Sequence, residues 1–104
     1  MNDDLRAIVS YFYDDSYEEA MAVLRGDLAR ARADIPWAAQ FRARWQRLKD
    51  AVRDRSLPPG DAFELVAIGG NRVLHENSDE EAYRWLALMI ANAERPDGRI
   101  DPYV

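Results

Sequence analysis

Apolar residues in this chain recur at helical spacing and do not alternate as they would in a strand. Leu5, Ile8, Val9 and Phe12 fall at positions i, i+3, i+4 and i+7, which places them on one face of a helix. β-branched residues never alternate with polar ones over four or more positions, so a sheet has little support. We therefore expect an all-α fold, a single-domain bundle of four to five helices over residues 1–104.

Start and stop signals divide the chain into five expected helices. The capping-box pattern S-x-x-E, in which serine and glutamate satisfy free N–H groups at a helix start, occurs at 16–19 and again at 78–81. Pro36 suits the first turn of another helix. Pro96-Asp97-Gly98 has the composition of a turn. The expected helices cover residues 4–13, 17–33, 36–55, 61–74 and 79–93, and a short irregular tail follows at about 96–104.

A pair of glycines, Gly69-Gly70, lies inside the fourth expected helix. Glycine lets a second backbone approach closely, and it also weakens a helix enough to end it early. The pair predicts one of these two outcomes, and the sequence leaves the choice open.

Charge and composition exclude several classes of protein. The net charge of −5 is divided into −5 over residues 1–19, +5 over 20–55 and −5 over 56–104. The absence of cysteine excludes disulfides, thiolate catalysis and cysteine-ligated zinc. No apolar run approaches the roughly 20 residues of a membrane span, and the acidic first residues are unlike a secretory signal. We expect a cytoplasmic protein with no membrane partner.

The most informative segment for function is residues 11–19, where three tyrosines, one phenylalanine and four carboxylates lie within nine positions. Tyrosine supplies contact area at a protein interface, and carboxylates steer a basic partner toward it. The alternative is ordinary helix capping, in which acids in a first turn complement the helix dipole. We expect a partner-binding surface made of Tyr11, Tyr13, Asp14, Asp15, Tyr17, Glu18 and Glu19.

A second acid-rich segment precedes the fifth expected helix, and it contributes Asp79, Glu80 and Glu81. If the two acid-rich helix starts lie at one end of the bundle, they form one negative patch. Such a patch would suit the cationic cleft of a nuclease or another phosphate-handling protein. We therefore include these three residues in the expected partner-binding surface.

The expected helix over residues 36–55 is rich in arginine and supports an alternative function. Arg42, Lys49 and Arg53 flank its apolar stripe, which is compatible with a nucleic-acid-associated regulator. The other interpretation is a solvated face whose long basic side chains cover the edge of the core. Because Trp37 lies on the apolar stripe itself, with Phe41 and Trp45, we expect these rings in the core, and nucleic-acid binding is the less favoured function.

Catalytic patterns are absent from the sequence. His75 is the only histidine, and we expect it to be structural or on the surface. No H-E-x-x-H, P-loop, G-x-S-x-G or calcium-loop pattern occurs. We therefore expect a protein that is not an enzyme, with no cofactor, no metal ion and no small-molecule substrate.

Two segments carry a resemblance to a known family. The aliphatic turn from Leu5 leads into Tyr11-Phe12-Tyr13-Asp14-Asp15. It resembles the opening of small helical immunity proteins from bacterial contact-dependent growth inhibition systems, which often have a Tyr-Phe-x-x-Asp signature there. Trp85, inside an apolar helix near the end of the chain, is similar to their closing helix. The closing helix of the family usually follows an aromatic or proline-containing segment, whereas here it follows residues 76–81.

The resemblance implies a function for the whole chain. Proteins of this family bind one cognate toxin domain tightly in the cytoplasm and block it without catalysis. The toxins are commonly nucleases. As an expectation, the partner is therefore the C-terminal domain of a toxin delivered by a neighbouring cell.

Overall fold

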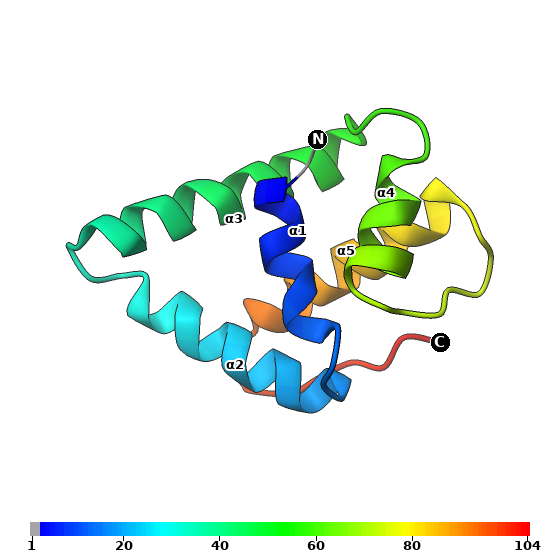
Figure 1. The fold of residues 1–104 in the computed structure, drawn as a ribbon. Coiled ribbons are helices and arrows are strands. Elements are labelled where there is room, and N and C mark those ends of the chain that lie inside the picture. Colours follow the sequence, from blue (N-terminus) through cyan, green and yellow to red (C-terminus); the bar gives the residue numbers. More distant parts are fainter. Residues whose placement is uncertain (1–2) are drawn as a thin grey trace.

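The structure, a computed structural model, describes residues 3–104 and confirms the all-α expectation (Figure 1). The described residues form five α-helices, one short 3-10 helix and one π-helical turn, and no strand. In chain order these elements are α1 (Asp3–Val9), η1 (Ser10–Phe12), α2 (Tyr17–Arg30), α3 (Pro36–Asp54), α4 (Asp61–Glu64), η2 (Leu65–Gly69) and α5 (Asp79–Ala93).

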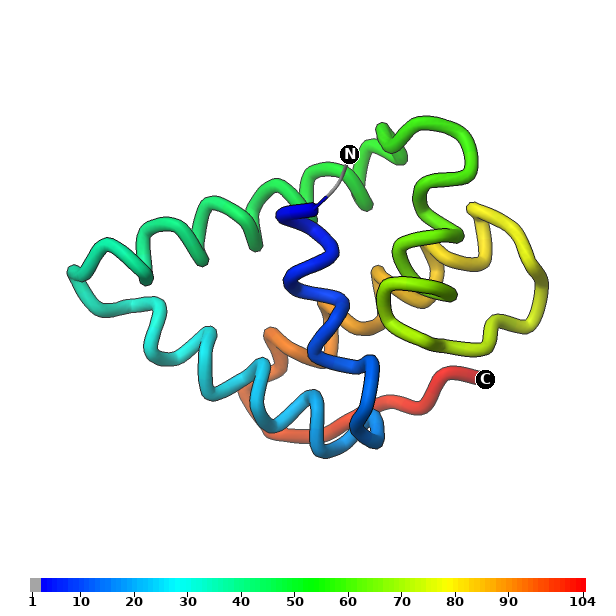
Figure 2. The backbone as a smooth tube through the Cα atoms, in the orientation of Figure 1, coloured from blue at the N-terminus to red at the C-terminus, as the bar shows by residue number. Residues whose placement is uncertain are grey.

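The helices surround one apolar core. α2 and α3 diverge from the loop that joins them, α1 crosses the space between them, and α5 lies behind α1 in this view (Figure 1). The tube in Figure 2 shows the C-terminal tail running back past the start of α2. Helical spacing places the apolar stripe of each helix toward this common interior. The largest fully buried apolar side chains are Phe12, Ile8, Met21, Leu24, Leu48, Leu86, Met89, Val9 and Val66.

The glycine pair has both of the effects that its sequence allows. The expected helix over 61–74 ends at Gly69, so the prediction that it continues to residue 74 is wrong. A Cβ atom placed on Gly70 would lie 2.7 Å from Cγ1 of Val9, which shows how closely this segment approaches α1. Asn71 then takes a left-handed conformation (φ 51°) that ends the helical path. As a consequence Val73 is 92% exposed, whereas Leu74 returns to the core from a non-helical loop.

Two other helices end earlier than expected. The first α-helix ends at Val9, and the 3-10 helix carries the chain on to Phe12, where Tyr13 N–H bonds the Ser10 carbonyl at 3.1 Å. α2 ends at Arg30 rather than near residue 33. Arg42 of α3 donates to carbonyl oxygens just beyond that end, which satisfies acceptors that a helix C-terminus leaves open.

Trp37 does not belong to the core, contrary to its position on the apolar stripe of α3. Its ring is 41% exposed and stacks on Phe41, with 5.3 Å between ring centres. Phe41 and Trp45 are buried as expected. Trp37 lies in the first turn of α3, next to the loop that joins α2 and α3. Because the apolar stripe of α3 already begins here, its first ring extends past the neighbouring structure that would cover it.

Candidate protein-binding surface

The turn between η1 and α2 carries the first acid-rich segment, and its backbone is held by the loop that follows η2. Arg72 donates to the carbonyl oxygens of Phe12 and Asp15, the latter at 2.7 Å. Asn71 donates to the carbonyl oxygen of Tyr13 at 3.2 Å. These bonds satisfy main-chain acceptors that no helix satisfies. The turn therefore presents its side chains from a fixed backbone.

The start of α2 has the capping box that the sequence predicts. Oγ of Ser16 accepts a hydrogen bond from the N–H of Glu19 at 3.2 Å and donates to its carboxylate at 3.0 Å. This arrangement satisfies one of the free N–H groups of the first turn. It also fixes the direction in which Glu18 and Glu19 leave the helix.

Four carboxylates of this segment remain without a cationic partner: those of Asp14, Asp15, Glu18 and Glu19. All four residues are exposed. Across the described part of the chain, none of the ion pairs includes them. The segment therefore carries uncompensated negative charge at the N-terminal end of a helix. We call Tyr13–Glu19 the acid-rich turn.

The three tyrosines of the expected surface have different roles. Tyr13 is 48% exposed and is free to contact a partner. The hydroxyl of Tyr11 donates to the buried carboxylate of Asp27, and burial raises the pKa of this phenol. Tyr17 is half-buried, and its hydroxyl accepts from the amide of Asn92 at 3.0 Å. Of the three, Tyr13 is the side chain best placed for a protein contact.

The second acid-rich helix start, at α5, is engaged inside the molecule. The carboxylate of Asp79 accepts from the main-chain N–H groups of Gly60 at 2.7 Å and Phe63 at 3.0 Å, so it caps α4 from a distance. Its neighbours are paired with arginines: Glu80 with Arg55 at 3.8 Å, and Glu81 with Arg84 at 2.7 Å. The negative charge of this start is therefore largely compensated.

A pocket of about 410 Å³ lies between the acid-rich turn and the C-terminal tail. Tyr17 and Glu18 line it from α2, and Ile100 and Tyr103 line it from the tail. Tyr103 donates its hydroxyl to Glu81, so the pocket wall reaches the second helix start as well.

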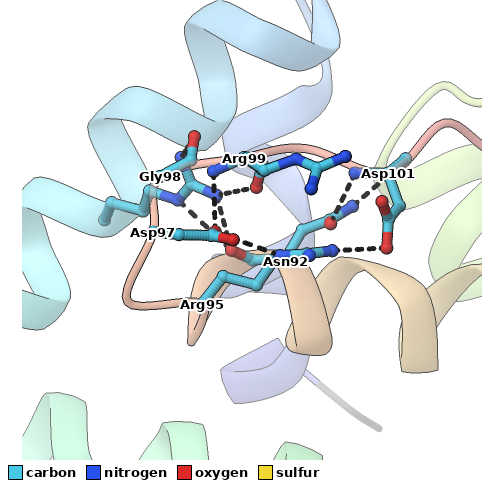
Figure 3. A network of polar contacts seen from close by, with 7 residues as sticks. Asn92, Arg95, Asp97, Gly98, Arg99 and Asp101 are labelled. Atoms are coloured by element: carbon cyan, nitrogen blue, oxygen red, sulfur yellow. Dashed lines mark hydrogen bonds and ion pairs between the residues drawn. The ribbon is translucent and has the colours of Figure 1, made fainter.

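The tail that forms this wall is fastened through its main chain (Figure 3). Asn92 is fully buried, and its side chain both donates to the Asp101 carbonyl at 3.0 Å and accepts from the Asp101 N–H at 2.9 Å. Arg25 donates to the carbonyl oxygens of Gly98 at 2.9 Å and Arg99 at 2.7 Å. These contacts hold an extended segment that contains no secondary structure of its own.

The basic groups of α3 are mostly engaged within the molecule. Arg47 pairs with Asp4, Lys49 with Glu94 at 2.8 Å, and Arg53 with Asp54 at 2.9 Å. The guanidinium of Arg42 donates to main-chain carbonyls, and that of Arg55 is shared between Glu80 and the Tyr83 ring. Little of this charge is left for phosphate groups, which weakens the nucleic-acid alternative.

From the sequence we expect the titratable residues of the described part of the chain to form no metal site and to include a structural or surface histidine. Over residues 3–104, no three of the histidine and acidic side chains lie close enough together to hold a metal ion. The ring of His75 is exposed and stacks on Tyr103 at 4.4 Å between centres. Within the same residues, no helix has the length and hydropathy needed to cross a membrane.

Three residues that shape this surface carry no signal in the sequence. Arg72 holds the acid-rich turn, Asn92 holds the tail, and Val73 exposes an aliphatic side chain beside the pocket. Arg72 acts over 57 or more residues of sequence, Asn92 acts over nine residues beyond the end of its helix, and Val73 follows an unexpected helix end, so periodicity and capping patterns cannot reveal them. Comparison with known proteins adds no family: no family model, curated protein or solved structure matches the chain.

Proposed function

We propose that this chain is an immunity protein, which binds a basic protein through the acid-rich turn and blocks it without catalysis. The observation that carries the proposal is the set of four unpaired carboxylates next to exposed Tyr13. At the start of α5 and along most of α3, by contrast, charged side chains have partners within the molecule. Acids left unmatched around an exposed aromatic ring have the character of a protein interface, with an anchor and a charged rim.

The partner that suits this surface is a protein with a cationic cleft. Nucleases have such clefts because they bind phosphate groups, and a row of carboxylates reproduces that negative charge. The resemblance of residues 5–17 to contact-dependent growth inhibition immunity proteins supports the same class of partner. The proposed partner is therefore a cognate toxin domain, and the proposed site of action is the cytoplasm.

The double substitution Asp14→Lys with Asp15→Lys tests this proposal. Because unpaired rim charges act mainly on diffusional encounter, we expect association with the cognate toxin domain to slow by about tenfold at low salt. The salt dependence of the association rate should flatten at the same time. Surface-based or stopped-flow kinetics at two salt concentrations would measure both effects.

A matched control places the same change in net charge elsewhere. Asp34 and Glu64 are both exposed and lie outside the acid-rich turn. The pair Asp34→Lys with Glu64→Lys should retain most of the association rate. If the two double variants behave alike, or if Asp14→Lys with Asp15→Lys binds and protects cells like the unchanged protein, the acid-rich turn is not the interface.

A further inference from the structure

The pocket beside the acid-rich turn has several apolar side chains in its otherwise mixed lining, together with one unpaired carboxylate. Tyr17, Val73, Ile100 and Tyr103 present mainly carbon surface, and Val73 is among the most exposed apolar side chains of the described chain. Glu18 lines the same pocket and has no ion-pair partner. A site of this kind suits a ligand that is apolar along its length and positive at its end.

Arg72 also lines the pocket, but its guanidinium is already engaged. Nε donates to the Gly70 carbonyl at 3.1 Å, and Nη2 donates to the carbonyls of Phe12 and Asp15. The group also lies over the Phe12 ring, 6.0 Å from its centre. Arg72 is therefore part of the wall, and its guanidinium is bonded to main-chain carbonyls and forms no ion pair with the acids of the acid-rich turn.

The ring of Tyr103 is similarly occupied. His75 stacks on it, and the guanidinium of Arg84 lies over it at 5.3 Å from the ring centre. A cationic ligand therefore finds the Tyr103 ring already in contact with two other groups, whereas the Glu18 carboxylate has no ion-pair partner among residues 3–104. Glu18 is the group in the pocket that can hold a positive charge.

We propose that this pocket receives a long basic side chain, arginine or lysine, from the bound partner. The aliphatic stem packs against Val73 and Ile100, and the charged end pairs with Glu18, with the other acids of the turn adding attraction. The inference rests on the proposed function, because it assigns one contact within the same interface. It makes Glu18 a specificity-determining residue and distinguishes it from Glu19, one position along the same helix turn.

A capped peptide provides a test that does not depend on knowing the partner. Acetyl-Gly-Arg-Gly-amide would be titrated into the full-length, nitrogen-15-labelled protein and followed by NMR, with the lysine peptide in parallel. We expect saturable shifts at the indole of Trp85, which also lines the pocket, and at the amides of Val73 and Ile100. The citrulline peptide, which has the same shape without the charge, and the peptide with a central glutamate should give none of these shifts.

Two matched variants identify the carboxylate. Glu18→Gln removes the charge from the pocket, and we expect it to weaken peptide binding about fivefold, as for an exposed ion pair of about 1 kcal/mol. Glu19→Gln makes the same change outside the pocket lining, keeps the capping-box pattern and should leave binding almost unchanged. Equal weakening by both variants would mean general attraction to the turn and would overturn the proposal.

Other outcomes also decide against the pocket. Absence of saturable shifts with both basic peptides, or equal binding of the citrulline or glutamate peptide, would overturn it. These results are separable from the toxin experiment. Slower toxin association in the Asp14 and Asp15 double variant, together with no peptide binding by the unchanged protein, would keep the interface and remove the pocket contact. Peptide binding by the unchanged protein, together with unaltered toxin association in the double variant, would remove the proposed function.

Discussion

The two acid-rich helix starts share a sequence pattern and differ in what surrounds them. Both have serine at the N-cap, and in both the N–H three residues later bonds the serine Oγ at 3.2 Å. At the start of α5, the carboxylate of Asp79 accepts from the N–H groups of Gly60 and Phe63. Glu80 pairs with Arg55, and Glu81 pairs with Arg84 and accepts from the Tyr103 hydroxyl. At the start of α2, the loop after η2 contacts only the backbone of the turn and leaves the acids to solvent.

This difference shows that the role of an acidic residue depends on its neighbours in space. Helix capping accounts for both motifs equally well. Only the position of arginines and free N–H groups from distant segments separates a structural carboxylate from one that is available to a partner. Substitutions at the second start should therefore change stability, whereas substitutions at the first should change binding.

The largest expected effect on stability is at Asp79. Asp79→Ala removes the acceptor of two main-chain N–H groups, those of Gly60 and Phe63, and we expect a loss of about 2–3 kcal/mol in the free energy of unfolding. Urea titration followed by tryptophan fluorescence would measure it. The matched change Asp15→Ala should stay within about 0.5 kcal/mol. Equal losses at the two sites would remove the distinction between the helix starts.

A smaller effect, dependent on pH, is expected at Glu81. The hydrogen bond from Tyr103 and the charge of Arg84 hold the pKa of Glu81 below its ordinary value. A carboxyl group with a lowered folded-state pKa stabilises the protein at neutral pH, and this contribution is lost as the pH falls through that pKa.

The stability advantage of the unchanged protein over Glu81→Gln should therefore narrow between about pH 5 and pH 3. Urea midpoints across this range would show it. Tyr103→Phe, which removes the hydrogen bond and keeps Arg84, should give an intermediate pH slope. A stability difference between the unchanged protein and Glu81→Gln that stays constant with pH would contradict the contacts assigned to Glu81.

The smallest effect is expected at Glu80. Its pairing with Arg55 spans 3.8 Å between two largely exposed side chains. Exposed pairs of this kind add little to stability, so Glu80→Gln should leave the urea midpoint unchanged within error. A loss comparable with that of Asp79→Ala would show that the second start acts as one coupled network.

Local patterns in the sequence predict the helices well because capping and apolar spacing act within a few residues. These patterns fail where contacts between segments that are far apart in the sequence determine the structure. Trp37 has the spacing of a core residue, but the diverging helices leave it uncovered. Val73 and Leu74 continue an apolar pattern that the glycine pair interrupts at Gly69.

The candidate surface is predicted only in part for the same reason. The acids of residues 14–19 are recognisable from composition. Composition does not reveal that these acids lack ion pairs, because this depends on where the arginines of α3, α5 and the later loops lie. Arg72 contacts residues that are at least 57 positions away in the sequence, and Asn92 contacts Asp101, nine positions away. Neither separation belongs to a helical repeat.

The hydrogen bonds from Asn92 and Arg25 to the C-terminal tail affect which substitutions the tail can accept. Both side chains hydrogen-bond main-chain groups between Gly98 and Asp101, so these bonds do not depend on the side chains of the segment, although Gly98 itself has a φ of 74° that favours glycine. A substitution at Ile100, which lines the pocket, would then change the pocket wall while these main-chain hydrogen bonds stay in place. Substitutions in the tail could therefore change which partner the protein prefers without any change to the helices.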